Sequence, residues 1–285
     1  MTNKTLLAHP AAPKLDASAS GMLRALFLHR RLVMQLVRRD ILGRYQGSFF
    51  GVAWSLVTPL LMLTVYTFVF SVVFGARWGS VSEQGGKLAF AVVLFAGLLV
   101  FNLFGETINR APGLILANAN YVKRVIFPLE VLPLVALLAS LFHAAIALLA
   151  WAAIAIFVLH GLPWTIVLLP LVLVPLLLGT LGVSWMLASL GVYARDIGQV
   201  TSILTMALLF LSPIFFPLSA VPERFRAVVM LNPMSFIIES ARGVLIDGHP
   251  PDWLILGGFW IGGALIAWLG WWWFQKTREG FADVI

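Results

Sequence analysis

Long uncharged blocks of apolar residues decide what this chain can fold into. Residues 52–75, for example, carry no charged side chain. A helix needs about 20 apolar residues to cross the hydrocarbon core of a bilayer, and this block is long enough. Over the whole chain 61% of residues are hydrophobic and 11% are charged, against about 25% charged in an ordinary soluble domain. We therefore predict an all-α integral membrane protein.

Further blocks of the same kind predict six membrane spans. The predicted spans are 52–75, 88–105, 131–159, 165–192, a fifth that begins with 199–211, and 253–274. An even number of spans places both termini on one face of the membrane. With the termini inside, 14 of the 19 lysines and arginines fall in cytoplasmic segments, which agrees with the positive-inside bias. We therefore interpret the net charge of +7 as a topology signal and a contact with lipid headgroups, not as a nucleic-acid site.

The chain before the first span divides into a tail and a basic amphipathic helix. Residues 1–20 show no periodicity and are expected to form a mobile tail, so that 21–285 make a single transmembrane domain. Over 22–41 an apolar arc lies opposite Arg24, Arg31 and Arg38, which favours a helix in the membrane interface. A cytoplasmic helix packed on protein is the alternative. The arc comprises Met22, Ala25, Leu26, Leu32, Val33, Leu36 and Val37.

Three glycines follow this helix at a spacing of four residues: Gly43, Gly47 and Gly51. Such a stripe on a helix removes side chains from one face and lets another backbone approach closely. The spacing therefore predicts close helix contacts where the chain enters the membrane.

Residues 105–133 form a polar and basic interruption between the second and third predicted spans. Prolines 112, 128 and 133 limit any helix inside it to about three turns, which is too short to cross a bilayer. Its basic residues Arg110, Lys123 and Arg124 place it on the cytoplasmic side, within reach of a soluble partner. We interpret region 109–128 as the part of a transporter that a separate, energy-supplying polypeptide contacts and moves.

Residues 212–251 fit neither a loop nor a span. Prolines 213, 217, 222 and 233 cut the segment into pieces too short to cross, although the pieces are apolar. Two short helices that re-enter the membrane from the outer face satisfy both observations. A small extracellular cap is the alternative.

The motifs of ATP binding and catalysis are missing from this sequence. It contains no G-x-x-x-x-G-K-[ST] loop, no catalytic or metal-binding motif and no cysteine. His143 lies well inside a span, while Glu106 and Glu130 are placed at span ends. Without an acid in evident reach, His143 is expected to form a helix–helix hydrogen bond. Some of the 21 Phe, 11 Trp and 4 Tyr are expected to line a path for a glycan, because aromatic rings stack on sugars.

Five stretches of the sequence carry a resemblance to a known family. They are RRDILGRYQGSFFGVAWSLVTPLLMLTVYTFVFSVVFG, ANANYVKRVIFPLEVLP, YARDIGQV, LSPIFFPLSAVPERFRAVVMLNPMSFIIESARGVLIDG and the terminal FADVI. Together they resemble the transmembrane subunit of type-2 ATP-binding-cassette exporters of polysaccharides. The O-antigen polysaccharide permeases are the nearest group, with teichoic acid and capsule permeases related. The resemblance covers about residues 22–285.

The resemblance implies a homodimer with two copies of a separate ABC ATPase that binds ATP and Mg, while this chain holds no cofactor. The implied substrate is an undecaprenyl-diphosphate-linked glycan, exported across the bacterial inner membrane. The coupling helix then falls on 118–127, a second ATPase contact on 193–196 and the outer gate helices on 222–245. The implied coupling residues are Asn118, Asn120, Tyr121, Lys123, Arg124, Phe127, Tyr193, Arg195 and Asp196. The implied gate residues are Ser212, Pro213, Phe215, Phe216, Pro217, Asn232 and Pro233.

The arginines before the first span are candidates to meet the lipid diphosphate at the inner leaflet. Arg38, Arg39 and Arg44, with Tyr45, form this predicted set, because the Arg fork matches phosphate oxygens. For any one arginine, binding of ordinary anionic lipid is the alternative. Two other classes stay open for the whole chain. A channel or drug exporter of the same fold would have a narrower conduit, and a membrane-embedded enzyme would need a pair of lumen-facing carboxylates.

Overall fold

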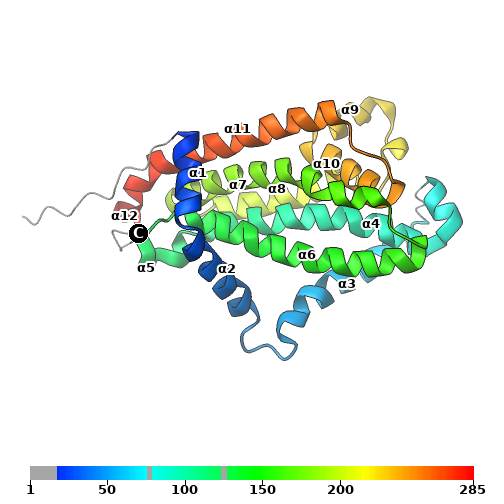
Figure 1. Ribbon diagram of the computed structural model, residues 1–285, viewed down its shortest axis with the longest axis horizontal. Coiled ribbons are helices and arrows are strands. Elements are labelled where there is room, and N and C mark those ends of the chain that lie inside the picture. The colour runs from blue at the N-terminus through cyan, green and yellow to red at the C-terminus, as the bar shows by residue number, and fades with distance from the viewer. Residues whose placement is uncertain (1–17, 76–78, 123–126) are drawn as a thin grey trace, which may run out of the picture.

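The structure, a computed structural model, describes residues 18–75, 79–122 and 127–285, and every regular element in these ranges is helical (Figure 1). The α-helices are α1 (Ala19–Leu28), α2 (Arg30–Tyr45), α3 (Trp54–Thr67), α4 (Gly79–Arg110), α5 (Ala119–Val122), α6 (Val131–Leu159), α7 (Leu169–Tyr193), α8 (Ile197–Leu211), α9 (Glu223–Leu231), α10 (Pro233–Arg242), α11 (Trp253–Thr277) and α12 (Phe281–Val284). Short 3-10 or π segments are η1 (Gly51–Ala53), η2 (Phe68–Val73), η3 (Ala111–Gly113), η4 (Leu116–Asn118), η5 (Trp164–Leu168), η6 (Leu218–Ala220), η7 (Gly243–Asp247) and η8 (Arg278–Gly280).

The structure confirms an all-α protein with several membrane-spanning helices. Five segments are long and apolar enough to cross a membrane: Gly51–Val73, Gly86–Gly113, Val131–Leu159, Trp164–Tyr193 and Trp253–Val284. The predicted fifth span departs from this pattern. Its helix α8 has 15 residues, about 22 Å of helix, against a hydrocarbon core of about 30 Å. The total reaches six if the pair Glu223–Leu231 and Pro233–Asp247, bent by 92°, counts as one broken span.

The second span is longer than predicted. We expected it to end near Gly105, but α4 continues to Arg110 and leads into η3. Polar residues such as Glu106 do not end a helix, whereas Pro112 does, because it cannot continue the backbone hydrogen bonds. Glu106 and Arg110 therefore lie on the span itself and not in a loop.

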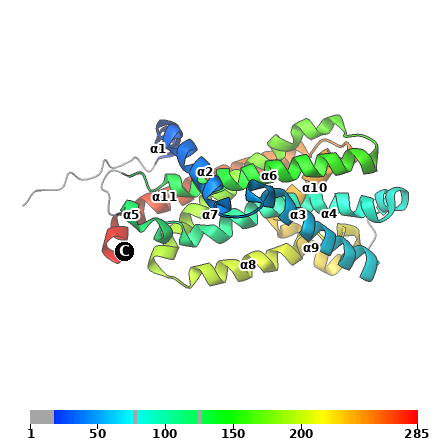
Figure 2. The same cartoon turned by 90° about the horizontal axis from the view of Figure 1, so that it is seen from below.

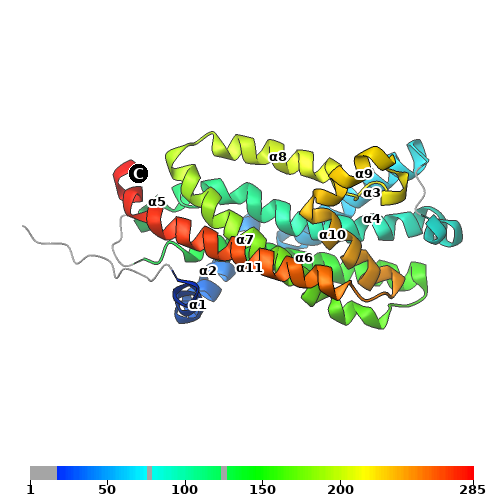
Figure 3. The same cartoon turned by 90° about the horizontal axis from the view of Figure 1, so that it is seen from above.

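Close contact between α7 and α11 depends on glycines (Figure 3). A Cβ atom built on Gly182 would lie 2.2 Å from the carbonyl oxygen of Ile266, and one on Gly270 would lie 2.1 Å from that of Gly182. Trp185 and Trp271 fill the space beside this crossing, with ring centroids 5.4 Å apart. The absence of side chains on the glycines is what brings the two backbones together.

The predicted N-terminal helix is two helices, because the backbone breaks at His29 between α1 and α2. Its apolar arc contacts protein: Val33, Leu36 and Val37 are buried in one cluster with Val131 and Val135 of α6. This contact agrees with the alternative of a helix packed on protein, and a position in the membrane interface stays a prediction. Residues 1–17 of the predicted tail lie outside the described residues.

The predicted glycine stripe is wrong as a helix-packing motif. α2 ends at Tyr45, and Gly47 and Gly51 adopt left-handed φ angles of 81° and 52° in the connection to α3. No atom lies within 4 Å of a Cβ built on Gly43, Gly47 or Gly51. Gly47 and Gly51 instead allow the chain to turn, because residues with L side chains are disfavoured at positive φ.

The described start of the chain and its C-terminus lie at the same end of the bundle. α1, α5 and α12 gather there, while the connections between α6 and α7 and between α10 and α11 lie at the opposite end (Figure 1). This arrangement places the two predicted coupling segments and both described ends of the chain together. Their cytoplasmic location stays a prediction.

Candidate functional site

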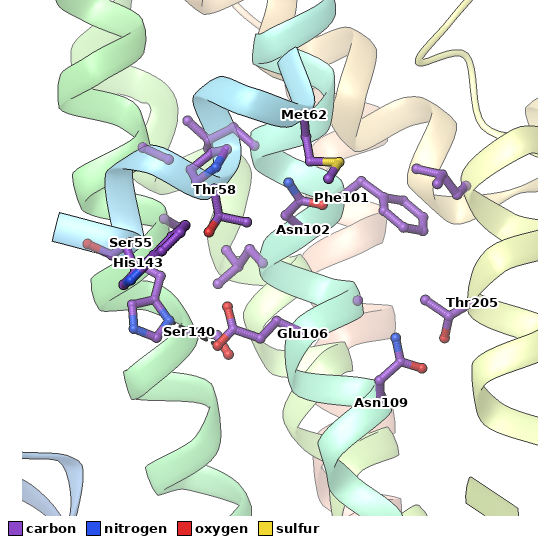
Figure 4. A pocket seen from close by; sticks show the side chains of 18 of the residues that line it. Ser55, Thr58, Met62, Phe101, Asn102, Glu106, Asn109, Ser140, His143 and Thr205 are labelled. Carbon is purple, nitrogen blue, oxygen red and sulfur yellow. Dashed lines mark hydrogen bonds and ion pairs between the residues drawn. The ribbon is translucent and has the colours of Figure 1, made fainter. Parts of the chain in front are cut away.

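A lateral cavity of about 680 Å³ lies between α3, α4, α6 and α8 (Figure 4). α3 passes across α4 in the view of Figure 2, and residues of α4 between Phe95 and Asn109 line one wall of the cavity. Aromatic and apolar side chains such as Trp54, Met62 and Phe101 share the lining with polar ones. The polar lining residues that bear no charge include Ser55, Thr58, Asn102, Asn109, Ser140, Ser202 and Thr205. The cavity is therefore a mixed surface at the depth of the membrane spans.

A charged cluster lies at the end of this cavity nearest α2. Arg44 Nη1 is 2.6 Å from Glu106 Oε1, and His143 Nδ1 lies 2.9 Å from the same oxygen and 3.1 Å from Arg44 Nη1. The Tyr45 hydroxyl lies 3.2 Å from His143 Nε2, and all four residues line the cavity. The expectation that His143 has no acid within reach is wrong. The error follows from ending the second span at Gly105, since the longer α4 carries Glu106 to a place opposite α6.

The four predicted lipid-diphosphate residues divide into two groups. Arg44 and Tyr45 line the cavity, whereas Arg38 and Arg39 do not appear in its lining. Arg39 instead donates to the Tyr121 hydroxyl. The neighbouring Asp40 accepts two hydrogen bonds from Arg110 Nη2, at 2.7 and 2.9 Å. α2 is thus connected both to the end of α4 and to the predicted coupling segment.

The described part of the predicted coupling helix consists of η4 and α5, and Lys123 and Arg124 lie outside the described residues. Asn118 Nδ2 donates to the Leu114 carbonyl over 2.9 Å, and Asn120 is exposed. The rings of Tyr121 and Phe127 stack with centroids 4.1 Å apart. This stack packs the segment against the chain that leads into α6.

The second predicted ATPase contact lies beside the first. A Cβ atom on Gly191 would lie 2.1 Å from the Pro112 carbonyl oxygen, so the end of α7 touches η3 directly. The Tyr193 hydroxyl donates to the Thr277 carbonyl over 2.8 Å, while Arg195 and Asp196 are exposed. The end of α7 therefore packs against η3, which leads into the first predicted coupling segment.

The predicted outer-gate residues meet at the opposite end of α8. Asn232 Nδ2 donates to Ser212 Oγ over 2.9 Å, and its Oδ1 accepts from the Met234 amide at the start of α10. Phe215 is buried and stacks on Phe70, with ring centroids 4.5 Å apart. Of the others, Pro213 is buried, Phe216 and Pro217 are half-buried, and Pro233 is exposed. The sequence prediction thus grouped residues that the fold brings together.

Sequence analysis missed Arg242, which holds the predicted gate region to the bundle. Its side chain is only 3% exposed. The guanidinium donates to the carbonyls of Pro213, Ile214 (3.0 Å) and Val93 of α4 (3.2 Å), and to Glu239. In the sequence it is one more arginine in a segment predicted to lie at the outer face, and no local pattern marks it as buried.

The chain is similar to known proteins over most of its length. Residues 31–246 match the profile of the ABC-2 type transporter family. The O-antigen export system permease protein RfbA of Myxococcus xanthus is 27% identical over 266 residues, which cover 93% of this chain and 99% of that protein. A Klebsiella pneumoniae protein of the same name is 24% identical over 260 residues, 89% and 95% of the two chains. The polysialic acid transport protein KpsM of Escherichia coli is 25% identical over 227 residues, 76% and 82%.

These matches confirm the resemblance inferred from the sequence. The family profile covers well over half of the chain, and the first relative is matched over nearly its whole length. The chain belongs to the ABC-2 type transporter family.

Proposed function

We propose that this chain is the channel-forming subunit of an ATP-driven exporter that moves a lipid-linked polysaccharide of the O-antigen class out of the cytoplasm. The observation that carries the proposal is the lateral cavity, where aromatic and aliphatic side chains alternate with neutral polar ones and a cationic residue lies at one end. Neutral hydroxyl and amide groups suit a sugar chain that must slide without tight binding at one point. The names of the relatives, which are export or transport proteins for O-antigen and polysialic acid, support this substrate class.

A second copy of the chain is the proposed partner across the cavity. α3 is one wall of the cavity, and only 6% of the first span is buried within the protein. α8, another wall, exposes Val200, Ile203 and Leu204. Two copies related by a twofold axis would cover these apolar faces and join two cavities into one channel.

We propose that two ABC ATPase subunits, which bind ATP and Mg, supply the energy for export. Their proposed contact is the surface made by 118–122 and 193–196, at the end of the bundle where both described chain ends lie. We place this end in the bacterial cytoplasm, because most lysines and arginines belong to it. Charge reversal at Lys123 and Arg124 is expected to abolish export while membrane insertion stays normal, and normal export in that variant would contradict this assignment.

Deletion of the gene in its native host tests the substrate class. Cells without the protein should lose their surface polysaccharide and accumulate lipid-linked polymer on the cytoplasmic side, as measured by membrane fractionation and protection from added glycosidase. The wild-type gene supplied in trans should restore the surface polymer. Unchanged surface polysaccharide would reject the proposal.

One observation favours a second candidate, an exporter of a small hydrophobic molecule. A separate cavity of about 580 Å³ lies between α7, α8, α10 and α11. Its lining is almost wholly apolar, with Thr180 and Asn232 as its polar members. A cavity of this size and character suits an apolar ligand. If the deletion leaves surface polysaccharide unchanged but raises cellular retention of lipophilic dyes, this second candidate replaces the first.

A further inference from the structure

We propose that Arg44, Tyr45 and His143 form a binding site for the diphosphate of a lipid-linked substrate, and that Glu106 occupies this site until the substrate arrives. The inference rests on the proposed function. It adds the side chains that would donate hydrogen bonds to the diphosphate, and it assigns to Glu106 the role of a resident competitor, an anion of the protein that fills the site before the ligand binds. The donors come from α2 and α6, and Glu106 comes from α4. All four side chains line the lateral cavity, so a ligand in the cavity can reach them.

The ion pair between Arg44 and Glu106 has the geometry of a replaceable contact. It joins one guanidinium nitrogen to one carboxylate oxygen, and the Arg44 side chain is 37% exposed. The neighbouring pair of Asp40 and Arg110 also uses one guanidinium nitrogen, Nη2, but there both oxygens of the carboxylate accept from it. An arginine bound through a single nitrogen keeps donors for a second acceptor, and its strongest partners are those that it binds with two parallel hydrogen bonds.

Glu106 imitates an anionic ligand in this cluster. Its Oε1 atom accepts from Arg44 over 2.6 Å and lies within hydrogen-bond distance, 2.9 Å, of His143 Nδ1. A bound anion at the same place would receive the same two hydrogen bonds, with the Tyr45 hydroxyl next to His143 as a third polar contact. A second negative charge beside ionised Glu106 would be repelled, so ligand binding requires the carboxylate to leave.

The need to displace a carboxylate selects the chemistry of the ligand. A group with a single negative charge would only exchange one anion for another. A diphosphate has more charge and more acceptor oxygens, and it accepts the two parallel bonds that the guanidinium offers. Because the site opens into a cavity between membrane spans, the diphosphate is expected on a lipid rather than free in solution.

Equilibrium binding of a radiolabelled polyprenyl diphosphate tests the proposal. The full chain is purified with its associated subunits and placed in phosphatidylcholine nanodiscs. Glu106→Gln removes the competing charge and is expected to tighten binding about threefold to tenfold, whereas Arg44→Gln is expected to weaken it about tenfold. Damage to the fold weakens binding and does not tighten it, so the opposite effects of the two variants separate a ligand site from a structural role.

Three controls sharpen the test. Asp40→Asn breaks an ion pair of the same helix, and Asp40 does not line the cavity. The affinity of this variant for the probe should stay within about twofold of wild type. If Arg44→Gln does not assemble, Arg44→Lys keeps the charge without the fork and should bind with intermediate affinity. Inorganic pyrophosphate and phosphatidylglycerol are added as competitors. Competition by pyrophosphate would show that the site recognises the diphosphate group. The stronger binding of the polyprenyl diphosphate would measure the contribution of its hydrocarbon chain.

The outcomes separate this proposal from the proposed function. If wild type binds the probe but Glu106→Gln binds it no tighter, the proposed role of Glu106 as a competitor is rejected. This holds even if gene deletion abolishes surface polysaccharide. Equal competition by phosphatidylglycerol would also overturn the proposal, because the site would then hold an ordinary membrane lipid. If Glu106→Gln tightens binding while the deletion leaves surface polysaccharide intact, the diphosphate site stands and the polysaccharide assignment fails.

Discussion

Arg242 shows how one side chain can hold several segments of a membrane protein together. Its guanidinium binds carbonyl groups of the chain after α8 and of α4, and removal would leave these buried acceptors without a donor. We expect Arg242→Ala to destabilise the protein by about 3 kcal/mol. Thermal unfolding in detergent measures this loss. The exposed Arg224 of α9 provides a matched control, and Arg224→Ala should change stability by less than about 0.5 kcal/mol.

Glu130 gives a pH dependence at the scale of a single residue. The residue directly precedes α6 and is fully buried, with Arg278 Nη1 3.1 Å from its Oε2. Burial raises the pKa of the Glu130 carboxyl above its ordinary value, although Arg278 acts in the opposite direction. Because the folded protein holds this proton more tightly than the unfolded chain, the contribution of Glu130 to folding is most favourable below the ordinary pKa of about 4.3. It falls as the pH rises toward the raised pKa.

The variant Glu130→Gln should remove this part of the pH dependence. Melting temperatures of the variant are expected to change less between about pH 4 and pH 7 than those of wild type. Glu223→Gln, an exposed carboxylate at the start of α9, should keep the wild-type profile. Parallel profiles for wild type and Glu130→Gln would show that the group does not titrate as inferred.

At the scale of elements, the crossing of α7 and α11 makes a sharp prediction because two glycines of α7 differ in surroundings. A Cβ atom on Gly182 would meet the backbone of α11, whereas no atom lies within 4 Å of one on Gly179. Gly182→Ala should force the helices apart and destabilise the protein by about 2 kcal/mol. Gly179→Ala should be neutral or stabilise it by up to about 1 kcal/mol, since alanine favours the helix. Thermal unfolding of both variants decides, and equal effects would contradict the close crossing.

The limits of the helices show which local sequence patterns predicted the structure correctly and which did not. The span at Val131–Leu159 has its predicted limits, because a block of that length between a proline and a turn has few alternatives. The limits of α4 and the break at His29 differ from the prediction, since helices end where hydrogen bonding stops and not where polarity changes. The Gly43 to Gly51 spacing imitated a packing stripe, although two of its members form a turn.

For the whole molecule, the proposed homodimer can be tested by cross-linking. The chain has no cysteine, so single introduced cysteines report without background. We expect Val65→Cys on α3 and Ile203→Cys on α8 to give cross-linked dimers in membranes, because both side chains lie on the exposed walls of the cavity helices. Phe157 of α6 is more exposed than either, at 84%, and Phe157→Cys should stay monomeric. Cross-links at Phe157 alone would move the interface to another face.

The sequence by itself determined the class of the protein and most of its spans, and it predicted where coupling and gate segments would lie. These properties depend on the length of apolar runs, on prolines and on the distribution of charge, all of which are local. The tertiary structure alone decided the lateral cavity, the position of Arg242 and the meeting of Arg44, Glu106 and His143. The residues of that cluster lie 37 to 99 positions apart in the chain. They meet only because the length and rotation of α4 and α6 bring particular faces together, and no local pattern encodes that register.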